Sequence, residues 1–206
     1  RVPCGRGRDA IAQLARSVDV LVVWGLERLE ELLPDPRPAV ISVHHGADDS
    51  EWSRRIVQEH RAHVDLVVSV NPSVATRLQG ENLRSLYIPN CVDPRRTRPT
   101  GLKILKGDHR VVLWAHRMSA EKRPDLAVQI AQHLPEGWVM WMVGGGPARH
   151  KIPDHPKLHL LPAHDPLGDL LAKADAFLST ADSEGCGLSA LEAMAAGVPV
   201  VSAPHG

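Results

Sequence analysis

The sequence predicts an α/β fold made of two Rossmann-like domains, each built on a parallel sheet. Short apolar runs recur along the 206 residues and alternate with segments of helical pattern. Most of these runs are continuously apolar, which is typical of strands buried on both faces of a parallel sheet. The repeated strand–helix–strand pattern then requires crossover connections between neighbouring strands.

Seven apolar runs are the expected strands, at Val20–Trp24, Ala39–Val43, Leu66–Val70, Val111–Ala115, Trp138–Val143, Ala176–Leu178 and Val198–Val201. Two helices are clearly marked between them. One runs from Pro124 to Leu134, because proline suits a first helical position and apolar residues then line one face. The other runs from Leu188 to Ala196, where Gly197 suits the left-handed position after a helix and Pro199 stops it.

The stretch from Pro89 to Asp108 does not follow the alternation of strand-like and helix-like segments. It is rich in proline and basic residues and has little periodicity. We interpret it as a linker between domains, although a long surface loop within one domain is the alternative. The expected organisation is a partial N-terminal domain (residues 1–89), a linker (90–107) and a C-terminal domain truncated at its end (108–206).

Composition excludes several classes of function. Lys plus Arg and Asp plus Glu both number 24, so the chain has no excess of positive charge that would favour binding of nucleic acid. The single Tyr and single Phe also leave few aromatic side chains on which the bases of a single strand could stack. The three cysteines lie far apart, which argues against disulfides or structural zinc and favours a reducing, cytoplasmic location.

Further expectations concern membranes and the ends of the chain. No apolar run approaches the ~20 residues of a membrane span, so we expect no transmembrane segment, which leaves peripheral membrane contact open. The chain has no initiator Met and begins in a polar stretch. We expect it to be a piece of a longer protein, truncated at both ends.

The strongest chemical signal is DSEGCGLSALEAMAAGVPVV, residues 182–201. Ligands of open α/β sheets bind at the carboxyl ends of strands, where this turn is expected. Gly185 and Gly187 allow close backbone approach, and the amides that open the helix can hold a phosphate. Glu184 and Glu192 can accept hydrogen bonds from sugar hydroxyls. The alternative is a loop charge and a solvated helix residue, but two glutamates that bracket this turn favour function.

The second signal is WAHRMSAEKRPDL, residues 114–126, again between a strand and a helix. Arg117 and Lys122 lie five positions apart across the turn, so two cations can converge there and neutralise a diphosphate. A solvated basic loop in which Glu121 pairs with one cation is the alternative. A third, weaker signal is MVGGGP, residues 142–147; it matches neither a Walker A loop nor a dinucleotide fingerprint.

Together these segments resemble the retaining, nucleotide-sugar-dependent glycosyltransferases of the GT-B fold, family 4 (group 1 glycosyltransferases). The resemblance runs over nearly the whole chain. It rests on four motifs. The signature at residues 182–201 matches at Glu184, Gly185, Gly187, Leu188, Leu191, Glu192, Ala193, Met194, Gly197 and Pro199, and an Arg-x-x-x-Glu-Lys motif matches at Arg117, Glu121 and Lys122. A Gly-x-Gly-Pro turn matches at Gly144, Gly146 and Pro147, and a linker motif matches at Pro89, Asn90, Val92 and Asp93. His116 and Arg123 stand where the family usually has glycine.

The resemblance implies a role for each matching position. Arg117 and Lys122 are expected to bind the donor diphosphate, and Glu192 the ribose hydroxyls. Glu184 is expected to hold the transferred sugar, with the backbone of Gly185 and the amides of Cys186, Gly187 and Leu188 nearby. The loop from Pro162 to His164 is expected against the base. His45 in the N-terminal domain matches a histidine near the reacting centre, although His44 beside it leaves that match open.

The expected function is transfer of a sugar from a nucleoside-diphosphate sugar to an acceptor hydroxyl, with retention of configuration and without a metal or other cofactor. No Asp-x-Asp occurs in the sequence, in agreement with metal independence. The acceptor, whether glycan, lipid or small molecule, is not revealed. The alternatives are a non-catalytic nucleotide-sugar-binding module and a sugar-nucleotide epimerase of the same fold.

Overall fold

The structure is a computed structural model that describes residues 4–24, 28–46, 58, 61–102, 104 and 106–204. It divides into two compact units, with the boundary between Asn90 and Cys91. Most of residues 90–107, the stretch interpreted above as a linker, therefore lies in the second unit. Within that unit the short helix α4 (Pro94–Thr97) contacts α6 (Gly168–Leu171) and α7 (Leu188–Ala195).

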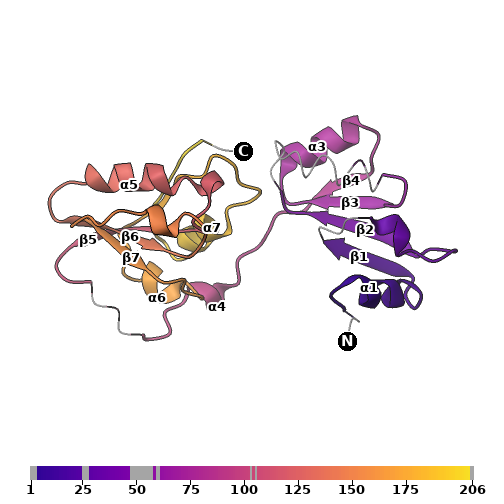
Figure 1. The fold of residues 1–206 in the computed structure, drawn as a ribbon, viewed down its shortest axis with the longest axis horizontal. Coiled ribbons are helices and arrows are strands. Elements are labelled where there is room, and N and C mark those ends of the chain that lie inside the picture. Colours follow the sequence, from indigo (N-terminus) through magenta and orange to yellow (C-terminus); the bar gives the residue numbers. More distant parts are fainter. Residues whose placement is uncertain are drawn as a thin grey trace. The chain divides into compact units, whose positions relative to one another are not determined.

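The first unit is a parallel sheet with strand order β1-β2-β3-β4 (Figure 1). Its described elements are α1 (Arg8–Ala15), β1 (Val20–Trp24), η1 (Leu29–Glu31), β2 (Ala39–His44), β3 (Leu66–Ser69), α3 (Pro72–Gly80) and β4 (Ser85–Tyr87). Leu21 and Val23 of β1 pack with Ala15 and Leu29 in one core cluster. Side chains alternate between the two faces of a strand, so one face of β1 points into this cluster.

The expectation of burial on both faces is wrong for β1. Val20, Val22 and Trp24 are 50%, 42% and 62% exposed. These three residues alternate with the two that enter the core, and β1 lies at the edge of its sheet. The sequence run is apolar throughout, but only alternate side chains are covered.

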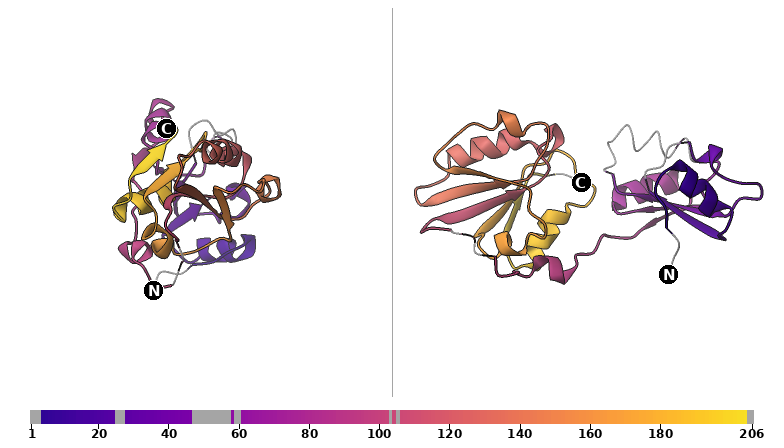
Figure 2. Two further views of the ribbon diagram at one scale, coloured as in Figure 1. Left: turned by 90° about the vertical axis from the view of Figure 1, so that its left-hand side faces the viewer. Right: turned by 60° about the horizontal axis from the view of Figure 1, so that its bottom comes forward.

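The second unit contains a five-stranded parallel sheet with order β7-β6-β5-β8-β9 (Figure 2). Besides α4, α6 and α7, its elements are β5 (Arg110–Ala115), η2 (Ala120–Lys122), α5 (Pro124–Gln132), β6 (Trp138–Val143), η3 (Arg149–Lys151), β7 (Leu158–Leu161), β8 (Ala176–Ser179) and β9 (Val200–Ser202). From β5 the chain builds outward through β6 and β7, then returns to β8 and β9 on the other side. The strand order therefore reverses between β5 and β8, which makes this pair the topological switch point.

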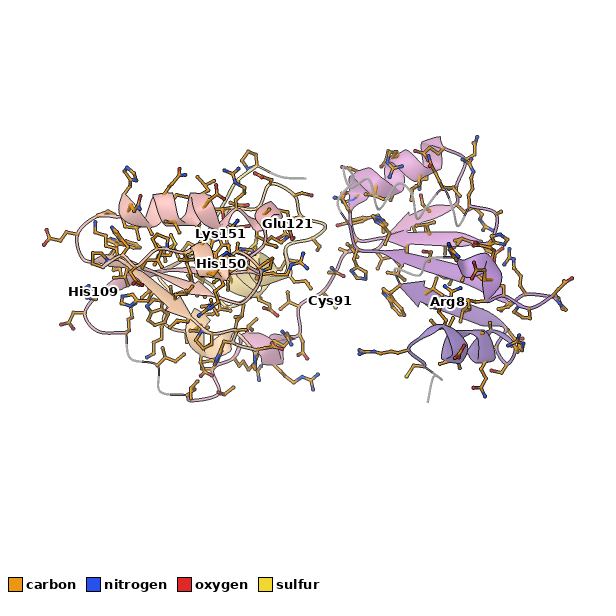
Figure 3. All side chains as sticks on the ribbon, in the orientation of Figure 1. Arg8, Cys91, His109, Glu121, His150 and Lys151 are labelled. Atoms are coloured by element: carbon orange, nitrogen blue, oxygen red, sulfur yellow. The ribbon has the colours of Figure 1, made fainter. Side chains whose placement is uncertain are left out.

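Helices cover both faces of this sheet. On one face, Val112 and Trp114 of β5 pack in a cluster with Ala127 and Ala131 of α5. On the other face, residues of β5, β6 and β8 form a cluster with side chains of α6 and α7. Side chains therefore fill the space on both faces (Figure 3). The predicted burial on both faces is confirmed for β5, β6 and β8, whose ends carry the site. It is wrong for the edge strand β9, in which Val201 is 60% exposed.

Candidate functional site

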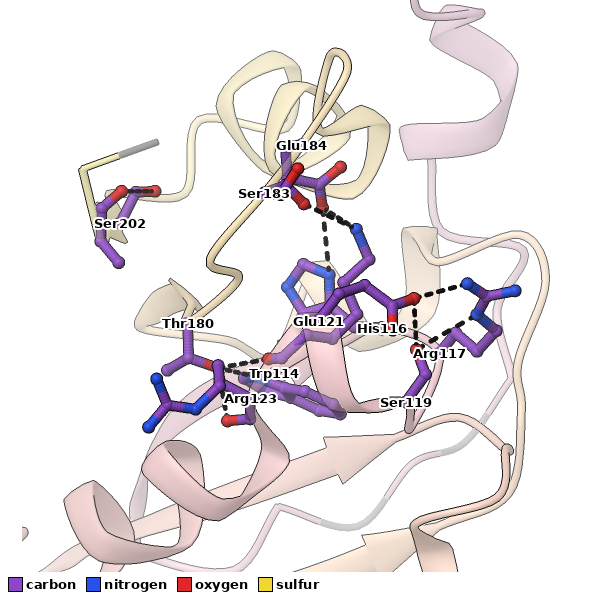
Figure 4. Close-up of polar contacts among 12 residues, drawn as sticks. Trp114, His116, Arg117, Ser119, Glu121, Arg123, Thr180, Ser183, Glu184 and Ser202 are labelled. Carbon is purple, nitrogen blue, oxygen red and sulfur yellow. Dashed lines mark hydrogen bonds and ion pairs between the residues drawn. The ribbon is translucent and has the colours of Figure 1, made fainter. Parts of the chain in front are cut away.

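Two loops meet at the carboxyl ends of β5 and β8, which pair in the sheet. Thr180, just after β8, accepts a hydrogen bond from the Trp114 indole at 2.8 Å and donates to the carbonyl of Lys122 at 2.8 Å. The amide of Asp182 donates to the carbonyl of Glu121 at 2.9 Å. The loops of the two strongest sequence motifs are thus joined at the switch point (Figure 4).

Glu184 and Lys122 form an ion pair across these loops. Lys122 Nζ lies 2.8 Å from Glu184 Oε1, and the two side chains are only 17% and 16% exposed. The same ammonium lies 3.5 Å from the carbonyl of Ser183. The ion pair therefore joins the two loops at a place that is largely shielded from solvent.

His116 lies below Glu184 (Figure 4). Its Nδ1 is 3.9 Å from Glu184 Oε1, and its side chain is almost fully buried. The ring packs edge-on between Trp114 and Phe177, with centroid distances of 5.0 and 5.6 Å. His116, at a position where the resemblance implies glycine, therefore points into the unit beneath the Glu184 carboxylate.

Arg117 pairs with a different carboxylate. Its guanidinium lies 2.5 Å from Glu121, which also accepts a hydrogen bond from the Ser119 hydroxyl at 2.6 Å. The hydrogen bond from Ser119 and then that from Arg117 lower the pKa of Glu121 to about 2. The two predicted phosphate-binding cations therefore pair with different carboxylates, and Arg117 is 70% exposed.

Glu192 is held by a residue that the sequence did not single out. Its carboxylate is buried on α7, and Arg96 Nε donates to Oε1 at 2.8 Å. The same guanidinium contacts Asp165 Oδ1 at 2.5 Å. The hydrogen bonds from Glu192 and then Asp165 raise the pKa of Arg96. Arg96 lies in the supposed linker and 96 residues from Glu192, so no local sequence pattern connects them.

The helix α7 begins at Gly187, which has the left-handed conformation with φ of 60°. No side chain caps this end of the helix. Its first amides, which have no partner within the helix, are therefore available to an anion, and the helix dipole favours one. Cys186 is partly buried beside them and is a free thiol.

The glycine-rich turn after β6 packs against the loop after β5. Gly144 has φ of 142°, and a Cβ built on it would lie 2.1 Å from the carbonyl oxygen of His116. A Cβ built on Gly146, which has φ of 144°, would lie 2.5 Å from the carbonyl oxygen of Met118. The amide of Met118 donates to Gly145 at 2.8 Å. Glycine is thus required at two of the three positions by backbone contact.

A cavity of about 360 Å³ opens at these loops, and its lining includes Arg96, Arg117, Gly144, His164, Asp165 and Glu192. These residues come from all three predicted motifs, from the loop expected at the base and from α4. A larger cavity of about 860 Å³ lies between α5 and η3, and its lining contains none of the predicted site residues. We assign the site to the smaller cavity because the charged and glycine-rich motifs converge there.

His45 belongs to the first unit. It directly follows β2 and is exposed. Its expected place near the reacting centre stays a prediction.

Among the residues that the structure describes, no cluster of three or more His, Cys, Asp or Glu side chains could hold a metal ion. Within the same described part, no helix has the length and apolar character to cross a membrane.

Comparison with known proteins identifies relatives of both units. The family model "Glycosyl transferases group 1" matches residues 109–206. A D-inositol 3-phosphate glycosyltransferase from Xylanimonas cellulosilytica is 32% identical over 198 residues, which are 84% of this chain and 45% of that protein. The chain thus spans less than half the length of this curated relative.

Several solved structures share the fold. Anabaena HepE in complex with UDP-glucose has a TM-score of 0.76 at 18% identity, covering 97% of this chain and 63% of its own. TarM has a TM-score of 0.77 at 17% identity, covering 95% of this chain and 44% of its own. Sucrose-phosphate synthase from Thermosynechococcus elongatus has a TM-score of 0.71 at 16% identity, covering 97% and 61%. At these identities the likeness establishes the fold, two Rossmann-like α/β units of the GT-B type.

Proposed function

We propose, from the match of residues 109–206 to the family model of group 1 glycosyltransferases, that the protein transfers a sugar from a nucleoside-diphosphate sugar to an acceptor hydroxyl. One observation carries the proposal. Arg117, Gly144, His164 and Glu192 come from four separate segments of the sequence and line one cavity. The relative HepE, whose structure contains UDP-glucose, supports a nucleotide-sugar donor.

In this proposal the donor lies along the carboxyl ends of the strands. Glu192 accepts hydrogen bonds from the ribose hydroxyls, and the loop from Pro162 to His164 faces the base. Arg117 and the first amides of α7 bind the diphosphate. The uncapped start of α7 supports this arrangement because free helix amides are suited to phosphate.

Lys122 and Glu184 act together at the transferred sugar. Glu184 binds the sugar hydroxyls, and Lys122 keeps its contact with Glu184 while reaching a phosphate oxygen, since an ammonium has three donors. In the reaction a bond forms between the acceptor oxygen and the anomeric carbon. The bond from that carbon to the diphosphate oxygen breaks, and the departing nucleoside diphosphate accepts the proton that the acceptor hydroxyl loses.

Two finer features complete the proposal. The anomeric configuration of the donor is retained, and no metal ion takes part. The argument for metal independence is that Arg117 and Lys122 supply two positive charges where negative charge develops on the leaving diphosphate.

The test uses the protein with candidate donors in the presence and absence of a chelator. NMR of the product should show the anomeric configuration of the donor, with equal activity in both samples. An inverted product would contradict retention, and loss of activity on chelation would contradict the charge-neutralising role of Arg117 and Lys122. Binding without turnover would indicate a non-catalytic module, and interconversion of sugar nucleotides without an acceptor would indicate an epimerase.

A further inference from the structure

Arg96 and Arg95 are neighbours on α4 but have different environments. The helix begins at Asp93, whose carboxylate accepts a hydrogen bond from the amide of Arg95 at 2.9 Å. The Arg95 side chain folds back onto Asp93 and is 87% exposed. Arg96 instead extends toward α7, where its guanidinium enters the lining of the cavity.

The Arg96 guanidinium connects three segments of the second unit. Its Nε donates to Glu192 on α7, and its terminal nitrogen donates to Asp165 in the loop that follows β7. The planar fork of an arginine suits such bridging, because its donors have fixed directions. Glu192 is buried, so without a cation its charge would lack compensation.

This contact orients the Glu192 carboxylate. Arg96 occupies one side of Oε1. A carboxylate offers about four acceptor sites on its two oxygens, so this bond restrains Oε1 and leaves capacity for two adjacent hydroxyls. Since Arg96, Asp165 and Glu192 line the same cavity, the group that orients the carboxylate is itself part of the cavity wall.

Arg96 is not required to attach its segment to the unit. Residues 100–102 are already tied to α6 by Asp169, which accepts hydrogen bonds from the amides of Thr100, Gly101 and Leu102 at 2.8, 3.0 and 3.2 Å. The Thr100 hydroxyl donates to the same carboxylate at 2.5 Å. A purely structural role for Arg96 would therefore duplicate an anchor a few residues away.

We propose that Arg96 is a positioning residue of the nucleotide site, which holds Glu192 and Asp165 so that the Glu192 carboxylate faces the ribose of a bound nucleoside diphosphate. This inference rests on the proposed function and adds a residue from outside the second unit's sheet. It predicts that loss of Arg96 affects recognition of ribose hydroxyls more than recognition of phosphate or base.

The test measures ribose recognition directly. Titration of the protein with UDP, GDP and ADP selects the tightest ligand, which is then compared with its 2′-deoxy form. Arg96→Met removes the guanidinium and keeps most of the aliphatic stem. We expect it to weaken binding of the ribonucleotide by about 10-fold or more, the effect of losing a hydrogen bond to a charged group. Binding of the 2′-deoxy form should change by much less.

Two control variants separate this effect from damage to the fold. Arg95→Ala changes the exposed neighbour on the same helix and should leave both affinities unchanged. Asp169→Ala removes the structural anchor and should lower the melting temperature without a preference for ribose. If Arg96→Met fails to fold, Arg96→Lys keeps Glu192 neutralised, and the same ribose-specific loss is expected because one ammonium cannot hold both carboxylates in the geometry of the fork.

The outcomes distinguish the two proposals. If the wild type binds a nucleoside diphosphate but the Arg96 variants bind both ligand forms normally, or lose both equally, the positioning role is wrong and the proposed function stands. If the wild type binds none of the three nucleoside diphosphates, the proposed function fails and the positioning role fails with it.

Discussion

The ammonium of Lys122 lies 2.8 Å from Glu184 Oε1, and this ion pair joins the loop after β5 to the loop after β8 at the switch point of the sheet. About five-sixths of the surface of each side chain is covered, so the ion pair is largely buried but keeps some contact with solvent. Removal of one partner leaves a poorly solvated charge. This relation provides the first prediction.

Lys122→Met should lower the free energy of unfolding by about 1–3 kcal/mol, because Glu184 is left without its cation in a largely buried place. Adding Glu184→Gln should cost less than the sum of the single changes, since the two residues share one interaction. Urea unfolding of the two single variants and the double variant measures this coupling. Lys173→Met, at an exposed lysine, is the control; strictly additive losses would mean that the pair contributes nothing.

Arg117→Ala should weaken binding of a nucleoside diphosphate by about 2–3 kcal/mol, the loss expected for a charge-assisted contact to phosphate. Binding of the corresponding nucleoside should not change. Arg110→Ala is a suitable control, because Arg110 starts β5 at the opposite end of the strand and lies over the Trp138 ring. Calorimetric titration compares the three proteins, and equal losses for nucleoside and diphosphate would remove Arg117 from the phosphate site.

Much of the second unit could be predicted from sequence, because its central strands are covered on both faces. β6 has the predicted bounds, and β5 differs by one residue.

Two strands were not predicted. The short edge strand β4 of the first unit was missed, since buried Ser85 and exposed Leu86 give it no recognisable pattern. β7 was missed for a similar reason, because His159 interrupts its apolar residues with an exposed side chain.

The site could be predicted only where its residues lie in contiguous motifs. Glu184 and Glu192 bracket one turn and helix start, and their position after a strand was sufficient to identify them. Arg96 could not be found in this way. Its contact with Glu192 joins residues 96 positions apart, and it depends on how α4 packs against α7, which no periodicity encodes.

Gly144→Ala and Gly145→Ala should differ sharply although they are adjacent. A Cβ at Gly144 would lie 2.1 Å from the carbonyl oxygen of His116, whereas a Cβ at Gly145 meets nothing within 4 Å. We expect Gly144→Ala to cost at least about 2 kcal/mol of unfolding free energy and Gly145→Ala to stay within about 0.5 kcal/mol. Thermal unfolding monitored by circular dichroism compares them. Similar losses in both variants would contradict the packing of this turn against the loop after β5.

The Asp65–Arg37 pair in the first unit should make stability depend on pH in acid. Two hydrogen bonds from Arg37, at 2.6 and 3.0 Å, and then one from the amide of Val40 at 2.7 Å, lower the pKa of Asp65 to about 2. Because the folded pKa lies below the usual aspartate value of 3.8, the carboxylate stabilises the fold above about pH 4. This contribution is lost as the pH falls toward 2.

Asp65→Asn should therefore destabilise the protein near neutral pH by about 1 kcal/mol, a small value because the pair is partly exposed and screened. The difference from the wild type should shrink between pH 4 and pH 2. Urea unfolding across this range measures it, with Glu30→Gln at an exposed carboxylate as the control. A difference that is independent of pH would show that the charge of Asp65 is not what stabilises β2.

The central claim is that the second unit binds a nucleoside diphosphate with Glu192 at the ribose. Isothermal titration of the wild type and of Glu192→Ala with UDP, GDP and ADP tests it most directly. At least one of the three should bind the wild type, and Glu192→Ala should weaken that binding by about 1.5–3 kcal/mol, the contribution of hydrogen bonds to a charged group. Absence of binding by all three, or equal affinity of the two proteins, would contradict the account.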